Sequence, residues 1–122
     1  MIELRTVLNV YLKSIYPNVY HSESVPETAT FPYLVYDLPN VIDDGESMET
    51  VVVDIDGWDI DKDTTALETL MAEVNYGLSK RTLATGNIAV TFYLDTKLSL
   101  RDDDPQIRRR KYTYQAKLFR KG

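Results

Sequence analysis

The sequence predicts an α+β fold, in which two amphipathic helices pack on one face of a mostly antiparallel sheet of four to five strands. Two segments repeat apolar residues every three or four positions, which is typical of helices. Other segments alternate apolar and polar residues or concentrate β-branched and aromatic ones, which is typical of strands. Short polar turns join consecutive strands and therefore favour antiparallel pairing. A chain of 122 residues has the size of one domain, so we expect a single domain over residues 1–122.

Both predicted helices have one apolar stripe. The first covers residues 2–15 and ends before Pro17, and its stripe consists of Leu4, Val7, Leu8, Tyr11, Leu12 and Ile15. The second covers residues 65–79, with the stripe Leu67, Leu70, Met71, Val74 and Leu78. Thr65 and Glu68 have the spacing of a capping box, and Asp61 and Asp63 lie where a helix N-terminus favours negative charge.

Three strands are expected before the second helix. The first is short and covers residues 19–21. The second covers residues 31–39 and is apolar on both faces. Such a strand is usually central in its sheet or covered by a partner chain. The strand over residues 48–60 alternates, so Val51, Val53 and Ile55 share one face. Its other face then carries Asp54, Asp56 and Trp58.

The strands after the second helix also alternate. In residues 88–100 every even position except Thr96 is apolar, which predicts one core-facing row of Ile88, Val90, Phe92, Leu94, Leu98 and Leu100. In residues 107–120 the core-facing row is Tyr112, Tyr114, Ala116 and Leu118, and the opposite row includes Arg109, Lys111 and Lys117. We expect four core residues to join the second helix to the sheet, namely Leu70, Val74, Phe92 and Leu94.

Charge is distributed unevenly along the chain, whose net charge is −5. Residues 37–73 contain twelve acidic side chains and one lysine, whereas residues 97–122 contain nine basic and three acidic ones. The two segments could pair within one sheet, or the acidic surface of one copy could meet the basic surface of another. Charge alone favours the first interpretation. The overall acidity argues against sequence-specific nucleic-acid binding.

The composition removes much enzymatic chemistry. The chain has no cysteine and one histidine, which excludes disulfides, thiolate metal sites and sites with two imidazoles from one chain. Asp59, Asp61 and Asp63 match the start of a calcium-binding EF-hand loop, but Thr64 and Leu70 replace its glycine and glutamate. Nucleotide-binding and hydrolase motifs are missing from the sequence. We therefore predict a non-enzyme with no catalytic, cofactor-binding or metal-binding residues and no cofactor, and no membrane segment.

Two other kinds of site stay open as alternatives. Residues 108–121 mix basic and aromatic side chains, as some nucleic-acid-binding modules do. Tyr112 and Tyr114 fall in the core-facing row, which argues against stacking on bases. Because the same chain carries the acidic segment 37–73, a contact with protein is favoured over one with nucleic acid. A weak divalent-cation site between Asp54 and Asp56 is the second alternative, and a calcium-dependent domain would use it.

The order of these segments resembles one family. The resemblance lies in an aromatic strand after a proline and a strand ending in Trp-Asp that leads into a helix, here with Phe31, Pro32, Tyr33, Tyr36, Trp58 and Asp59. This pattern resembles the tail completion or tail terminator proteins of long-tailed bacteriophages and prophages. The resemblance implies a non-enzymatic subunit of a ring, typically a hexamer, that terminates the tail tube and joins it to the head connector. A head-side connector or stopper protein is the alternative.

The same resemblance implies where the protein works and with which partners. We expect assembly in the host cytoplasm, a place in the virion at the head–tail interface, and contacts with the tail tube and head connector proteins. DNA would pass through the lumen without specific binding, and no membrane is involved. The candidate interface residues are Tyr33, Tyr36, Asp54, Asp56, Trp58, Arg109, Lys111 and Lys117. If acidic and basic surfaces of neighbouring copies meet, reversing Arg109 and Lys111 to Glu should weaken assembly and leave the monomer folded.

Overall fold

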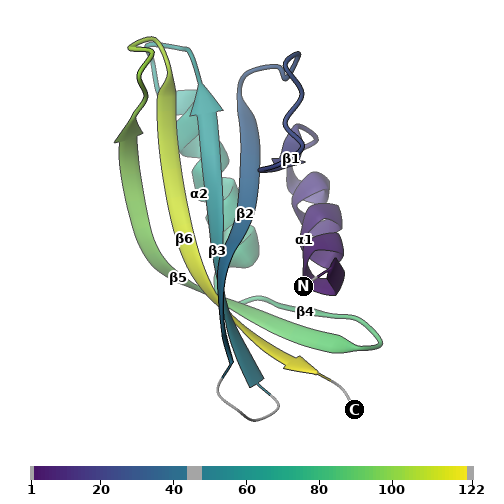
Figure 1. Ribbon diagram of the computed structural model, residues 1–122. Coiled ribbons are helices and arrows are strands. Elements are labelled where there is room, and N and C mark those ends of the chain that lie inside the picture. The colour runs from purple at the N-terminus through teal and green to yellow at the C-terminus, as the bar shows by residue number, and fades with distance from the viewer. Residues whose placement is uncertain (1, 44–47, 121–122) are drawn as a thin grey trace.

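The computed structural model describes residues 2–43 and 48–120 and shows two helices and a six-stranded sheet (Figure 1). The strands lie in the order β1-β2-β3-β6-β5-β4. The elements in chain order are α1 (Ile2–Ile15), β1 (Val19–His21), β2 (Tyr33–Asp43), β3 (Met48–Asp59), α2 (Thr65–Leu78), β4 (Thr82–Ala84), β5 (Ile88–Arg101) and β6 (Arg108–Arg120).

The predicted α+β class is confirmed, with two differences in the sheet. It has six strands among the described residues instead of four to five, because β4 has three residues and is too short to show a periodicity. The pair β1–β2 is parallel, whereas the other strand pairs are antiparallel. Residues 22–32 carry the chain back, so that β2 begins at the same end as β1. The segment expected to be central, β2, has β1 beside it only at residues 34–36.

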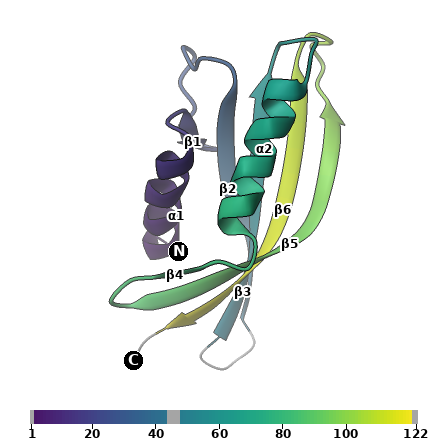
Figure 2. The same cartoon turned by 180° about the vertical axis from the view of Figure 1, so that it is seen from behind.

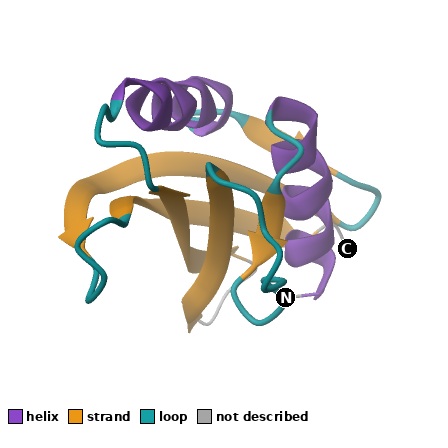
Figure 3. Ribbon diagram, turned by 90° about the horizontal axis from the view of Figure 1, so that it is seen from above, coloured by secondary structure: helices purple, strands orange, loops and turns teal. Residues whose placement is uncertain are grey.

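The two helices cover the same face of the sheet (Figures 2 and 3). The whole predicted stripe of α2 is buried, and the centre of the α1 stripe is buried at Leu4, Leu8 and Leu12. These side chains form one core with the inward row of each long strand. Of the four residues expected to join α2 to the sheet, Leu70, Val74 and Phe92 are buried, while Leu94 is half-buried at the edge of the core. Neither described helix is long and apolar enough to span a bilayer.

A β-bulge in β5 overturns part of the predicted core. Leu94 pairs with Tyr114 and Thr96 pairs with Thr113, so Asp95 is an extra residue. Because side chains alternate between faces, one extra residue moves everything after it to the opposite face. Leu98 and Leu100, predicted to face the core, therefore face away from the helices, and Leu98 is 48% exposed. Lys97 takes the core-side position, with its Nζ 5.1 Å from the centre of the Tyr112 ring.

The start of α2 also differs from its sequence pattern. The capping box does not form, because the N-cap residue is Thr64 and Thr65 is already the first helical residue. The Glu68 carboxylate pairs with Arg110 of β6 instead. Asp63 accepts hydrogen bonds from the Thr65 N–H at 2.9 Å and the Thr65 hydroxyl at 2.6 Å. These hydrogen bonds lower the pKa of Asp63. An acidic residue stabilises this helix end as expected, but Asp63 does so through the turn before the helix.

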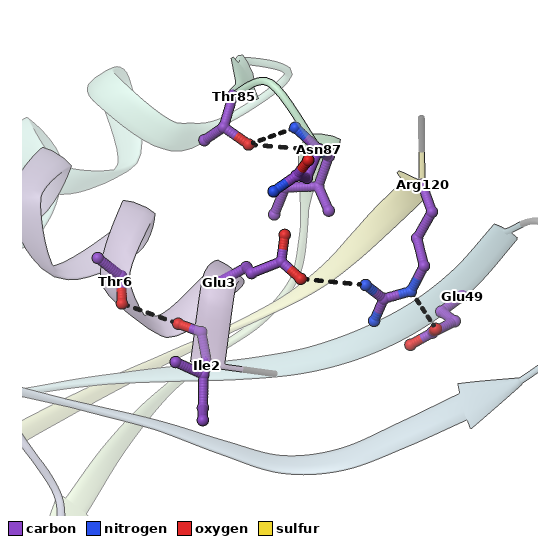
Figure 4. A network of polar contacts seen from close by, with 8 residues as sticks. Ile2, Glu3, Thr6, Glu49, Thr85, Asn87 and Arg120 are labelled. Atoms are coloured by element: carbon purple, nitrogen blue, oxygen red, sulfur yellow. Dashed lines mark hydrogen bonds and ion pairs between the residues drawn. The ribbon is translucent and has the colours of Figure 1, made fainter. Parts of the chain in front are cut away.

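Polar contacts hold α1 against the rest of the chain at both of its ends. The Tyr11 hydroxyl donates to the carbonyl of Gly77 in α2 at 2.6 Å. At the opposite end, Arg120 lies between Glu3 of α1 and Glu49 of β3, at 3.5 and 3.2 Å (Figure 4). The charged groups at this end are solvent-accessible, so these ion pairs contribute at most about 1 kcal/mol each.

Candidate subunit and partner interface

The face of the sheet that carries no helix, called the outer face below, brings most of the predicted interface residues together. Strand register places four neighbouring strands in rows across this face. One row consists of Tyr33, Trp58, Arg109 and Leu100, and the next of Val35, Asp56, Lys111 and Leu98. Aromatic, charged and aliphatic side chains thus alternate over β2, β3, β6 and β5 on a surface that the helices leave open.

Trp58 is the centre of a stack of flat side chains on the outer face. The Tyr33 ring lies on one side of it, nearly parallel at an interplanar angle of 7°, with ring centres 6.1 Å apart. The Arg109 guanidinium lies 4.0 Å from the centre of the Trp58 ring, within the range of a cation–π contact. Tyr20 and Phe31 extend the cluster, because their rings lie 6.1 and 5.2 Å from that of Tyr33. These contacts hold large side chains against one another on neighbouring strands.

An incompletely satisfied ion pair lies beside the stack. Arg109 Nη2 is 3.4 Å from Asp56 Oδ2, and the two side chains are 19% and 15% exposed. Asp56 Oδ1, Trp58 Nε1 and Arg109 Nε are covered and have no hydrogen-bond partner among the described residues. Burial raises the pKa of Asp56 in spite of the opposing charges of Lys111 and Arg109, and the charge of Asp54 adds to the rise. Desolvation therefore outweighs the ion pair at this carboxyl group.

This raised pKa predicts a pH dependence that the substitution Asp56→Asn removes. The folded protein binds the Asp56 proton more tightly than the unfolded chain does, whose ordinary pKa is 3.8. The stabilisation that proton binding gives to the folded state is complete below pH 3.8 and is lost as the pH rises through the pKa of Asp56 in the folded protein. Thermal melts followed by circular dichroism between about pH 3 and 7 should therefore show that the stability of the variant relative to the parent increases as the pH rises. A difference in melting temperature that is independent of pH would contradict the assignment.

The structure places the eight predicted interface residues in three environments. Tyr33, Asp54, Asp56, Trp58, Arg109 and Lys111 share the outer face, where Asp54 accepts a 2.7 Å hydrogen bond from the Thr113 hydroxyl. Lys117 lies on the same face but toward the far end of β6, and its Nζ donates to Thr50 at 2.8 Å.

Tyr36 does not belong to this surface, which corrects the expectation. It follows Tyr33 by three positions along β2, so its side chain points to the helix side of the sheet. There it is 3% exposed, and its hydroxyl donates to Asn9 Oδ1 of α1 at 3.0 Å. A side chain in this position packs the first helix against the sheet and is not accessible to a partner.

Sequence reasoning missed two aliphatic members of the outer face, Leu98 and Leu100. They reach it only because of the bulge at Asp95, and they lie beside Lys111 and Arg109 respectively. The signal was Thr96, the one polar residue in an otherwise apolar even-numbered series. A break of that kind indicates a register shift as readily as a tolerated polar residue.

The opposed charges of the chain meet within the subunit. Asp56, Glu68 and Glu49 each form an ion pair with an arginine of β6. For these groups, the acidic and basic segments therefore pair within one subunit, which is the interpretation that charge alone favoured. The charge reversal proposed from the sequence is no clean test of assembly, because Glu at position 109 would remove the cation–π contact and lie beside Asp56. That the doubly reversed monomer still folds stays a prediction.

The loop that partly matches an EF-hand and the basic strand have local roles in the structure. Asp61 and Asp63 accept backbone hydrogen bonds from Asp63 and Thr65 at 3.0 and 2.9 Å in the turn before α2. Within residues 2–43 and 48–120, no group of three or more His, Asp or Glu could hold a metal ion. In the basic strand β6, Tyr112 and Tyr114 are buried, which confirms their placement in the core. The Tyr114 hydroxyl donates to Asn75 of α2 at 2.9 Å.

A polar cleft of about 500 Å³ lies between α1 and β1, on the helix side of the sheet. Arg5, Lys13, His21 and Glu23 line it, so both signs of charge are present. The Glu23 N–H approaches His21 Nδ1 at 3.4 Å, and the His21 ring packs edge-on against Tyr36 with centres 5.4 Å apart. The histidine thus has a packing role in the wall of this cleft.

Comparison with known proteins agrees with the arrangement of these elements. The family model described as tail completion protein gp17 matches residues 5–118. A search of curated protein sequences finds no match. Among solved structures, a chain from the virion of a native gene transfer agent particle is similar, with a TM-score of 0.69 and 15% identity over 88% of this chain and 84% of that chain. At that identity the likeness concerns the fold, whereas the family match extends over nearly the whole sequence. The chain therefore belongs to the tail completion protein gp17 family.

Proposed function

We propose that this protein forms a ring that terminates the tail tube and joins it to the head connector. The chain is a structural protein of a phage or phage-like tail, and the observation that carries the finer proposal is the family match over residues 5–118. The similar chain belongs to a virion, which supports a place for this protein in an assembled particle. We propose a hexamer that assembles in the host cytoplasm, contacts the tail tube and head connector proteins, and lets DNA pass without specific binding.

The outer face supplies a contact surface suited to this role. Aromatic residues and arginine are enriched at protein interfaces, and rigid anchors lose little entropy on binding. Trp58, Tyr33 and Arg109 are already held by their mutual stacking. On the same face, Leu98 in the row next to this stack is 48% exposed, and Tyr93 farther along β5, beside Gln115, is 45% exposed, so each still has apolar surface that a partner can bury. The non-enzymatic character of the family agrees with a surface built for contact.

Leu98→Gln tests the outer face directly. The substitution keeps a similar side-chain size and adds no charge, and such surface changes usually alter folding stability by less than about 0.5 kcal/mol. Removing the apolar contact should weaken assembly about tenfold, which corresponds to roughly 1.4 kcal/mol. The measurement is the concentration dependence of ring formation by light scattering, together with tail lengths and head attachment in electron micrographs of complemented particles.

Tyr76→Gln is the matched control, because Tyr76 is 81% exposed on α2, on the other side of the sheet. It should assemble like the parent. Unchanged assembly and normal tails for Leu98→Gln would exclude the outer face as the contact surface. A parent protein that stays monomeric and leaves tails uncapped in the presence of tail tubes would contradict the ring itself.

A further inference from the structure

The second half of β5 is an open edge of the sheet. Its short neighbour β4 pairs only with Ala89, Val90 and Thr91. One isolated bridge continues this side, where Phe92 pairs with Ser79 and its carbonyl accepts the Lys80 N–H at 2.7 Å. Over residues 94–101 no described strand lies beside β5 on the side away from β6, and Figure 1 shows it as the outermost strand there. Its outward main-chain groups are therefore open to a further strand.

The opposite edge of the same sheet is open as well. β1 covers β2 only at residues 34–36, and the Ser22 N–H then bonds to the Tyr36 carbonyl at 3.0 Å. Beyond this point β2 continues over residues 37–43 with β3 on one side and no described strand on the other. One subunit thus carries two different free edges of similar length at the two sides of a single sheet.

The geometry points to main-chain pairing between subunits, in which residues 94–101 of one copy lie beside residues 37–43 of the next copy. This inference rests on the proposed ring. Pairing of two different edges is a heterologous contact, which is the kind that a closed ring repeats. Addition of a strand to a sheet edge is also a common way for one chain to recognise another through backbone hydrogen bonds.

The charges of the two edges agree with this partner. Residues 94–101 contain Lys97, Arg101 and one acid, Asp95, whereas residues 37–43 contain Asp37 and Asp43 and no base. A net positive edge meets a net negative one, which favours this pairing over that of two identical edges. The same contact would bring the outer faces of neighbouring subunits into one continuous surface, because side chains on one face of a sheet stay on that face across its strands.

Features of both edges restrain unspecific pairing. Each segment contains a register shift, at Asp95 in β5 and between Asp37 and Asn40 in β2. Pro39 lacks an N–H group, and Lys97 places a charge on the other edge. Bulges, proline and lysine are the devices by which sheet edges avoid aggregation. A partner therefore has to match the irregular register, and in the proposed pairing a second copy in one orientation does so.

Hydrogen–deuterium exchange of the full chain tests this pairing, with the monomer compared with the assembled ring. Amides within residues 94–101 and 37–43 should exchange at least about tenfold more slowly in the ring. Residues 82–84 of β4, which the inference leaves at the surface, are the internal control. A ring in which neither segment gains protection would overturn the edge pairing and leave the proposed ring intact. A protein that forms no ring even with tail tubes would contradict both.

The absence of cysteine makes a second readout clean. Asp37 and Leu98 lie on the outer face at opposite edges, so the double variant Asp37→Cys, Leu98→Cys should form intermolecular disulfides in a ladder that ends at the ring number. The matched control is Asp37→Cys, Gln115→Cys, since Gln115 lies on the central strand β6. The control should stay uncrosslinked. Equal cross-linking of both pairs, in rings verified by light scattering, would contradict the proposal that residues 37–43 of one copy lie beside residues 94–101 of the next.

Discussion

Phe92→Ala is expected to lower the free energy of unfolding by about 3–5 kcal/mol, the range for deleting a buried aromatic side chain. Phe92 is completely buried and is among the largest buried side chains of the core. Its backbone also joins β5 to the segment after α2, because its N–H donates to the Arg81 carbonyl at 3.1 Å. The surrounding groups are therefore held in place, and the cavity left by the ring cannot easily collapse.

Urea unfolding followed by circular dichroism measures this effect, and Leu94→Ala is its control on the same strand. Leu94 points to the same side but is only half-buried, so its truncation should cost about 1–2 kcal/mol. This is less than the sequence alone predicts, because the bulge that follows ends the core at Leu94. Equal losses for the two variants would show that the core continues along β5.

Gly57→Val should also be strongly destabilising, by about 1–3 kcal/mol or more. A Cβ atom at Gly57 would lie 2.7 Å from Met71 Sδ and 2.8 Å from Leu67 Cδ1. Both partners are fully buried in the contact between α2 and β3. Either these side chains or the helix would have to shift, and the core contacts of the helix would weaken.

Gly86→Ala serves as the matched control for the glycine position. A Cβ there meets no atom within 4 Å, so its effect on unfolding should stay within about 0.5 kcal/mol. Thermal melts of Gly57→Val, Gly57→Ala and Gly86→Ala should then rank in that order of increasing stability. A Gly57→Val protein as stable as the parent would mean that α2 does not pack on β3 at this point.

Local periodicity determined the elements and most of their buried faces. The first helix, the short strand at residues 19–21 and the start of β5 have the predicted bounds, because the apolar periodicity and the turn residues that mark them are local features of the sequence. The buried stripe of α2 is also as predicted, since its spacing follows from the helical repeat. The placement of Trp58 and Asp56 on one face of β3 likewise follows from strand alternation. The family pattern of the sequence is confirmed by the match over residues 5–118.

Tertiary structure decided which residues share the outer face and how they are paired. The extra residue Asp95 is defined by the register of β5 against β6, which pairs residues far apart in the chain, so Leu98 and Leu100 could not be placed by alternation alone. The ion pair of Arg109 with Asp56 likewise depends on β6 lying beside β3. Periodicity reports the direction of a side chain relative to its own strand, whereas neighbours across the sheet depend on the lowest-energy pairing of all the strands.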